Sequence, residues 1–220
     1  MRTKPLLITL CITYSVIFLL LFYSHLFLFT FSQGIDTSIS SQTVTTIIGS
    51  VQGEIETQRV LVIEFTDFQC DYCAKNKDVL SKVSSSDVFV KRMHFPVTAI
   101  HQNAYAAALA YECVDLFTKG AVSKQAVDAL FARQSDLSQS ALKEYAIDFG
   151  LNQTTIEQCF ANEEIKQKVN RDLNFGLDLK LIGTPSYLVI PIQHPSLTTI
   201  LTGATATDLQ KTITNFLQIE

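Results

Sequence analysis

The sequence predicts an α/β domain with a block of helices inserted in its middle, and three observations support this prediction. Two apolar, β-branched runs at 59–68 and 87–97 indicate strands, and the helical stretch 73–83 between them indicates a parallel pair. From about 98 to 179 the signals are helical. The remaining segment indicates a hairpin followed by one amphipathic helix.

The N-terminus carries a long apolar segment. No formally charged residue follows Lys4 until Asp36, and about twenty apolar residues suffice to span a bilayer as a helix. Arg2 and Lys4 predict that the chain begins in the cytoplasm and continues outside it. We therefore expect residues 1–34 to form one transmembrane helix that anchors the protein, with a cleavable signal peptide as the alternative.

The next segment, residues 35–55, is rich in Ser, Thr and Gly. It is predicted to be a linker with one edge strand at Val44–Ile48. Residues 56–220 then form the predicted globular domain, which is long enough to bury a core. The formal net charge is -4 without any basic block, so nucleic acid is not an expected partner.

Two cysteines, Cys70 and Cys73, follow the first predicted strand at its junction with a helix. A thiol at a helix N-terminus is stabilised as the thiolate, which is the form that attacks disulfides. Cys70 is therefore the expected nucleophile, and Cys73 is the thiol expected to attack a mixed disulfide. A structural disulfide and a zinc site are the alternatives. Zinc needs four ligands, and no second cysteine pair supplies them, so we expect no metal and no cofactor.

The hairpin near the C-terminus consists of two predicted strands, 185–190 and 197–203, and the last helix covers 205–219. The hairpin indicates an antiparallel extension of the parallel pair.

Four stretches of the chain carry a family resemblance: "EFTDFQCDYC", "HFPVTAIHQNAYAAALAYEC", "DFGLNQTTIEQCF" and "IGTPSYLV", in this order. The chain from about Arg59 to Leu217 resembles the DsbA-like thiol–disulfide oxidoreductases of the thioredoxin superfamily. The resemblance implies a thioredoxin-like α/β fold with an inserted helical domain at about 98–179. It also implies thiol–disulfide exchange outside the cytoplasm.

The resemblance assigns roles to further residues. Pro185 matches the family's cis-proline, beside the cysteine pair, and the backbone of Thr184 would then pair with an extended substrate segment. Glu64 matches a buried acid that could relay protons for Cys73; a strand-end acid reaching solvent is the alternative.

Two further cysteines, Cys113 and Cys159, also have counterparts in the family. Pairing Cys70 with Cys73 by proximity leaves these two to form a structural disulfide between helices, with two separate buried thiols as the alternative.

The sequence departs from the family within the motif, where Asp71 and Tyr72 separate the cysteines. A carboxylate beside Cys70 disfavours its thiolate, and Tyr72 supplies no cation. We expect a disulfide that is less oxidising than those of the strong oxidases.

The expected function is a membrane-anchored oxidoreductase, outside the cytoplasm in the periplasm or at the cell surface, that forms disulfides in exported proteins. A membrane redox partner of the DsbB or VKOR type is implied by the resemblance. The alternatives are a reductase or isomerase of the same fold, or a tethered binding or chaperone module without turnover.

Overall fold

The computed structural model describes residues 39–55 and 57–219 of the chain, which belong to one compact unit. The expected anchor at residues 1–34 lies outside the described residues. Within the described ranges, no helix is both long enough and apolar enough to cross a membrane.

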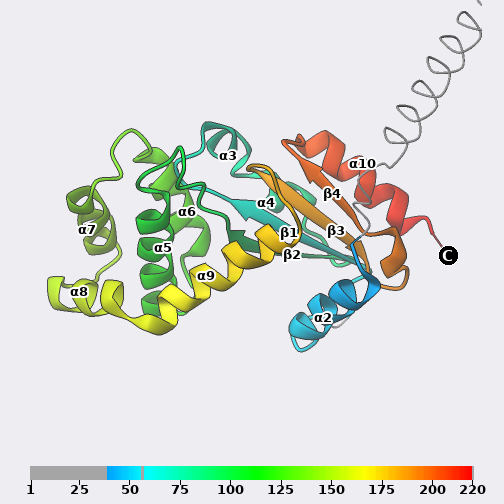
Figure 1. The fold of residues 1–220 in the computed structure, drawn as a ribbon, viewed down its shortest axis with the longest axis horizontal. Coiled ribbons are helices and arrows are strands. Elements are labelled where there is room, and N and C mark those ends of the chain that lie inside the picture. Colours follow the sequence, from blue (N-terminus) through cyan, green and yellow to red (C-terminus); the bar gives the residue numbers. More distant parts are fainter. Residues whose placement is uncertain (1–38, 56, 220) are drawn as a thin grey trace, which may run out of the picture. The chain divides into compact units, whose positions relative to one another are not determined.

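The described residues form a four-stranded sheet (Figure 1). Its strands, in the order β2-β1-β3-β4 across the sheet, are β2 (Val88–His94), β1 (Val60–Thr66), β3 (Ser186–Pro191) and β4 (Thr199–Thr202). β1 and β2 are parallel, while β3 runs antiparallel to both of its neighbours. The predicted parallel pair and the antiparallel hairpin are therefore both present, with a short 3-10 helix (Pro195–Leu197) inside the hairpin. All seven residues of β1 are buried, because helices cover both faces of the sheet.

Alternate residues of β1 enter two different cores. Val60 and Val62 pack in one cluster with residues of α4 (Val79–Val83) and α10 (Ala206–Leu217). Leu61, Ile63 and Phe65 face the opposite side, in a cluster that includes residues of α2 (Ser41–Val51) and of the C-terminal part of α9 (Glu163–Asp178). Because alternate side chains of the strand point to opposite faces, both faces of the sheet are apolar here. A layer of helices packs on each face.

Five helices lie between β2 and β3 and form a block with its own core beside the sheet (Figure 1). They are α5 (Ala104–Thr118), α6 (Ser123–Ala132), α7 (Gln139–Asp148), α8 (Gln153–Ala161) and α9. α5 is rich in alanine, and its small side chains let the surrounding helices approach it closely. α9 is the element shared with the sheet, because its first half packs on this block and its second half packs under β1.

Residues 35–55 were expected to be a linker with an edge strand at Val44–Ile48. This prediction is wrong for residues 41–51, which form helix α2. Val44, Ile47 and Val51 lie on one face of this helix and are buried against the sheet. Ser40 caps the helix, because its Oγ accepts a hydrogen bond from the N–H of Thr43 at 3.1 Å. The β-branched composition favoured a strand, but the helical spacing of the apolar residues buries them on one side.

Candidate active site

Cys70 lies where β1 gives way to a helix, and it is the N-cap residue of α3 (Asp71–Asn76). A tight turn leads into it, because the N–H of Cys70 donates to the carbonyl oxygen of Asp67 at 3.1 Å. Cys70 and Cys73 are both free thiols, and Cys73 lies within the first turn of α3. The two sulfurs of the motif are therefore adjacent at the start of one helix.

A loop far away in the sequence reaches the same place. The peptide bond between Thr184 and Pro185 is cis. The Cys70 sulfur lies 3.4 Å from the carbonyl oxygen of Thr184, which accepts a hydrogen bond from the thiol form. The register explains this contact, since Ser186 at the start of β3 pairs with Phe65 near the end of β1. The sheet thus brings together the two motifs that the sequence separates by more than a hundred residues.

The two thiols have opposite acidities. A hydrogen bond from the Cys73 thiol lowers the pKa of Cys70 to about 5, against the opposing effect of burial. The side-chain hydroxyl of Thr184 and the N–H groups of Cys73 and Tyr72 act in the same direction as the Cys73 thiol. Burial, together with the hydrogen bond to Cys70, raises the pKa of Cys73 far above its ordinary value. At neutral pH the reduced site therefore holds a thiolate at Cys70 and a thiol at Cys73.

The two residues between the cysteines, Asp71 and Tyr72, are exposed. Tyr72 is 65 % exposed, and Lys75 Nζ lies 5.3 Å from its ring centroid. Asp71 is not among the groups that set the pKa of Cys70, which is lowered by hydrogen bonds to its sulfur. The expected effect of the Asp71 carboxylate on the thiolate stays a prediction.

Glu64 is buried in the centre of the sheet and is only 1 % exposed, so the alternative of an acid reaching solvent is wrong. Its Oε2 accepts a hydrogen bond from Arg92 Nε at 2.7 Å, and its Oε1 accepts one from the Tyr187 hydroxyl at 3.4 Å. Burial raises the pKa of Glu64, although Arg92 and Tyr187 act in the opposite direction. Among the described residues, no hydrogen bond joins Glu64 to Cys73. A direct proton relay between them therefore has no support in this geometry.

Cys113 of α5 and Cys159 of α8 are joined by a disulfide with a Cα–Cα distance of 5.9 Å. The pairing implied by the family resemblance is thus present, and it ties two helices of the inserted block together.

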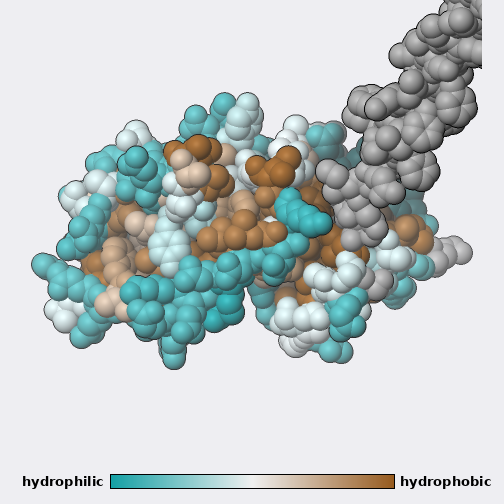
Figure 2. Space-filling view, viewed as in Figure 1, coloured by the Kyte–Doolittle hydropathy of each residue, from teal (hydrophilic) through white to brown (hydrophobic). Residues whose placement is uncertain are grey.

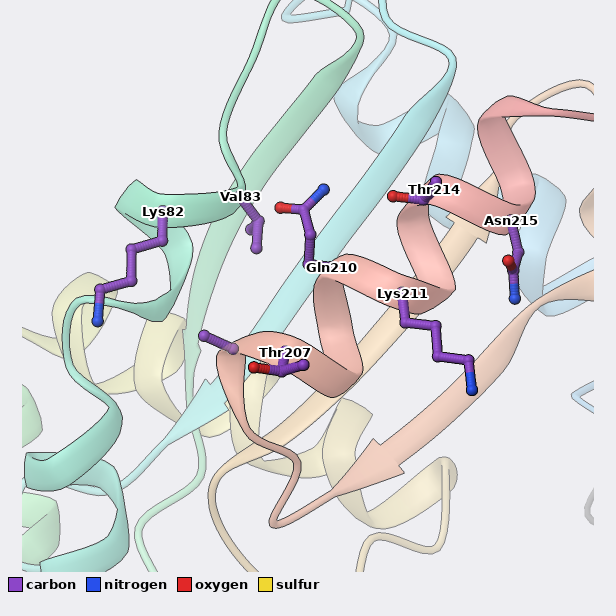
Figure 3. A pocket seen from close by; sticks show the side chains of 8 residues that line it. Lys82, Val83, Thr207, Gln210, Lys211, Thr214 and Asn215 are labelled. Carbon is purple, nitrogen blue, oxygen red and sulfur yellow. The ribbon is translucent and has the colours of Figure 1, made fainter.

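Two other features of the described part of the chain bear on function. No group of three His, Cys, Asp or Glu side chains there is placed to hold a metal ion. A shallow groove runs between α4 and α10 (Figure 3), and its lining residues include Lys82, Val83, Gln210 and Lys211. The residues that line this groove include no cysteine, histidine or carboxylate.

Residues 61–210 match the family described as the DSBA-like thioredoxin domain. The chain belongs to this family. The match contains Cys70, Cys73, the cis-proline and both cysteines of the disulfide. In this DsbA-like chain the pair Cys70 and Cys73 is the candidate redox centre.

Solved structures share the fold of this DsbA-like chain. A thioredoxin-like oxidoreductase from Silicibacter pomeroyi DSS-3 has a TM-score of 0.62 and 17% identity, covering 74% of this chain and 90% of that one. DsbA2 from Pseudomonas aeruginosa has a TM-score of 0.58 and 21% identity, covering 71% of this chain and 88% of that one.

A curated relative is the Na(+)/H(+) antiporter NhaA 3 from Salinispora tropica, which is 26% identical over 137 residues. The match covers 61% of this chain but spans only 21% of the length of the antiporter.

Proposed function

We propose that this protein is a membrane-anchored oxidase that forms disulfides in exported proteins through Cys70 and Cys73. The observation that carries the proposal is the acidity of Cys70, whose pKa is lowered to about 5. A stabilised thiolate stabilises the dithiol form of the pair, which makes the corresponding disulfide more oxidising. This pKa lies between those of thioredoxin, at about 7, and DsbA, at about 3.5.

The proposed reaction begins with the Cys70–Cys73 disulfide. A substrate thiolate attacks the Cys70 sulfur, and Cys73 leaves as a thiolate and takes up a proton. A second substrate thiolate then attacks the substrate sulfur of this mixed disulfide, and Cys70 leaves as the stabilised thiolate. Two electrons have passed from the substrate dithiol to the protein, and the substrate has gained one disulfide.

The surroundings of Cys70 suit extended, apolar segments of unfolded chains. Ile182, two residues before Thr184, is 91% exposed, and Tyr72, between the two cysteines, is exposed too. Figure 2 shows hydrophobic side chains over the segment that joins α9 to β3, which contains Ile182. In the proposal the backbone of Thr184 pairs with an extended peptide, while nearby apolar side chains contact the peptide's side chains.

The proposal places the domain outside the cytoplasm, where disulfides persist. The apolar segment 1–34 and the charged Arg2 and Lys4 support this orientation. Reoxidation then requires an electron acceptor, for which a quinone-linked membrane oxidase of the DsbB or VKOR type is proposed. Alkaline phosphatase fused after residue 55 tests the orientation, because the enzyme is active only after export; an inactive fusion would refute the location.

The direction of electron flow is tested by the reduction potential in glutathione buffers. A value between about -180 and -120 mV, the range from protein disulfide isomerase to DsbA, is expected for an oxidase with this acidity. Oxidation of reduced, unfolded ribonuclease by a stoichiometric amount of the oxidised protein is the direct assay. A potential near that of thioredoxin, about -270 mV, would instead identify a reductase. A pair that exchanges with neither glutathione nor ribonuclease would identify a binding module.

A further inference from the structure

The turn that leads into the active site contains a buried carboxylate to which the sequence assigned no role. Asp67 lies between the end of β1 and Cys70 and is 2% exposed. Its Oδ1 accepts a hydrogen bond from the N–H of Gln69 at 2.7 Å, and its backbone carbonyl accepts one from the N–H of Cys70. The side chain and the backbone carbonyl of Asp67 therefore both stabilise the turn that ends at Cys70.

The second carboxylate oxygen of Asp67 binds a different segment, which connects β2 to α5. Oδ2 accepts hydrogen bonds from the N–H of Val97 and from the ring nitrogen Nδ1 of His101, both at 2.8 Å. The neighbouring Gln69 adds a parallel link, because its Oε1 accepts a hydrogen bond from the N–H of Asn103 at 2.9 Å. The turn before Cys70 is thus fastened to the entry of the helical block by three hydrogen bonds.

We propose that Asp67 and His101 are positioning residues of the redox centre: they fix the turn Asp67–Cys70 and so hold the Cys70 sulfur at the start of α3. The N–H groups of Tyr72 and Cys73 and the Cys73 thiol can then all point at this sulfur. The N–H of Asp67 itself donates to the Cys73 sulfur, so the same turn holds both thiols. Neither Asp67 nor His101 exchanges electrons or protons with the substrate in this proposal.

The sign of one measurement separates positioning from simple charge. Asp67→Asn removes a negative charge, which by itself lowers the pKa of Cys70. It also removes an acceptor from a site with three donors, which releases the turn and withdraws the donors from the sulfur. We expect the second effect to dominate, so that the acid dissociation constant of Cys70 falls about tenfold, the order expected for a lost charge-assisted hydrogen bond. Asp71→Asn removes an exposed carboxylate next to Cys70 and should raise the acid dissociation constant of Cys70.

His101 provides a rescue test, because its side chain is 20% exposed and its replacement need not disturb a core. His101→Ala removes the donor to Asp67 and should lower the Cys70 acid constant in the same direction as Asp67→Asn. His101→Asn places an amide nitrogen near the position of Nδ1, so it should restore the constant to within about twofold of wild type.

Two matched controls lie elsewhere in the chain. Asp136→Asn alters a similar turn at the surface, where Oδ1 of Asp136 accepts from the N–H of Ser138 at 2.9 Å. Asp172→Asn alters a half-buried acceptor of the N–H of His94, at the end of β2. Asp136→Asn should change neither stability nor the acidity of Cys70. Asp172→Asn keeps an oxygen that can accept this N–H and should leave the acidity of Cys70 unchanged.

The experiment is a titration of thiolate absorbance in the reduced full-length protein and each variant, with thermal unfolding as the check of folding. It uses no substrate, so it decides this inference even if the oxidase proposal, on which the role in catalysis rests, fails. A Cys70 that is more acidic or unchanged in Asp67→Asn overturns the inference. If Asp67→Asn does not fold, the two His101 variants decide. An acid dissociation constant of Cys70 that is the same in His101→Ala as in the wild type overturns the inference. A lower constant in His101→Ala that is restored in His101→Asn supports it.

Discussion

At the scale of single residues, the opposite acidities of the two thiols give them separate tasks in the proposed reaction. Cys70 is the thiolate and Cys73 the buried thiol, so Cys70→Ser should abolish disulfide exchange. Cys73→Ser should still attack a substrate disulfide but should retain the substrate, because the thiol that would release it is missing. Non-reducing electrophoresis with a disulfide-bonded substrate measures both outcomes. Wild-type activity in either variant would refute the assignment.

The residues that the sequence predicted for the site are those marked by local motifs. Cys70 and Cys73 lie at the predicted junction of strand and helix, and Thr184 lies beside them. The partners of Glu64 were not predicted, because they depend on the register of the sheet. Arg92 and Tyr187 are opposite Glu64 on the two neighbouring strands, and nothing local in the sequence specifies that alignment.

The turn residue Asp67 was missed for a related reason. Its bonds to Val97 and His101 join segments about thirty residues apart, and they follow from how β2 leads into the helical block. The local signal is an aspartate at the end of a predicted strand. The side chain of an aspartate at such a place often accepts a hydrogen bond from the N–H two residues further on and so forms a turn. That pattern indicates the turn but not the second set of donors.

At the scale of elements, α2 is expected to contribute to stability rather than to serve as a tether. Ile47 is 6% exposed and packs in the cluster under β1, so Ile47→Ala should lower the free energy of unfolding by about 2–4 kcal/mol. Thr46→Ala, on the exposed face of the same helix, should change it by less than about 0.5 kcal/mol. Urea unfolding followed by circular dichroism compares the two. Equal stability of both variants would show that this segment contributes little to the fold.

The sequence did contain the signal for α2. Val44, Ile47, Ile48 and Val51 are spaced as i, i+3, i+4 and i+7, which is typical of one face of a helix. The weight given to β-branched residues led to the strand prediction instead. Packing against the sheet overrides the modest helix propensity of valine and isoleucine, and this packing is not visible in the segment alone.

The disulfide between α5 and α8 makes a second prediction at this scale. It closes a loop of 46 residues, for which the chain-entropy model gives about 4 kcal/mol of stabilisation. The double variant Cys113→Ala with Cys159→Ala should therefore lose about 4 kcal/mol in urea unfolding. The acidity of Cys70 should stay unchanged, because neither cysteine of the disulfide contributes to the lowering of its pKa. A shift in that acidity would show that the helical block influences the redox centre through this bond.

At the scale of the whole molecule, the order of elements was predictable, because each change of hydrophobic period marks one strand or helix. The contacts between the helical block and the candidate site were not predictable. α9 belongs to both cores, and tertiary packing makes the hydrogen bonds from residues 97–103 to Asp67 and Gln69. The active site therefore depends on the docking of the block as well as on the sheet.

The redox centre should also make the stability of the reduced protein depend on pH. The pKa of Cys70 is about 5 in the folded protein and 9.0 for an unperturbed thiol. Between these values the unfolded chain binds a proton that the folded protein does not, so the free energy of unfolding rises with pH. The contribution is absent below about pH 5 and grows by up to about 1.4 kcal/mol per pH unit above it.

This pH dependence can be isolated by comparing the reduced wild type with reduced Cys70→Ser. Subtracting the two removes the titration of other groups, and the raised pKa of Cys73 has no effect below the ordinary pKa of a thiol. Urea unfolding between about pH 5.5 and 8 should show the wild type gaining stability over the variant as the pH rises. A constant or shrinking difference would mean that Cys70 is not held as a thiolate in the folded protein, and the proposed oxidising character of the pair would lose its physical basis.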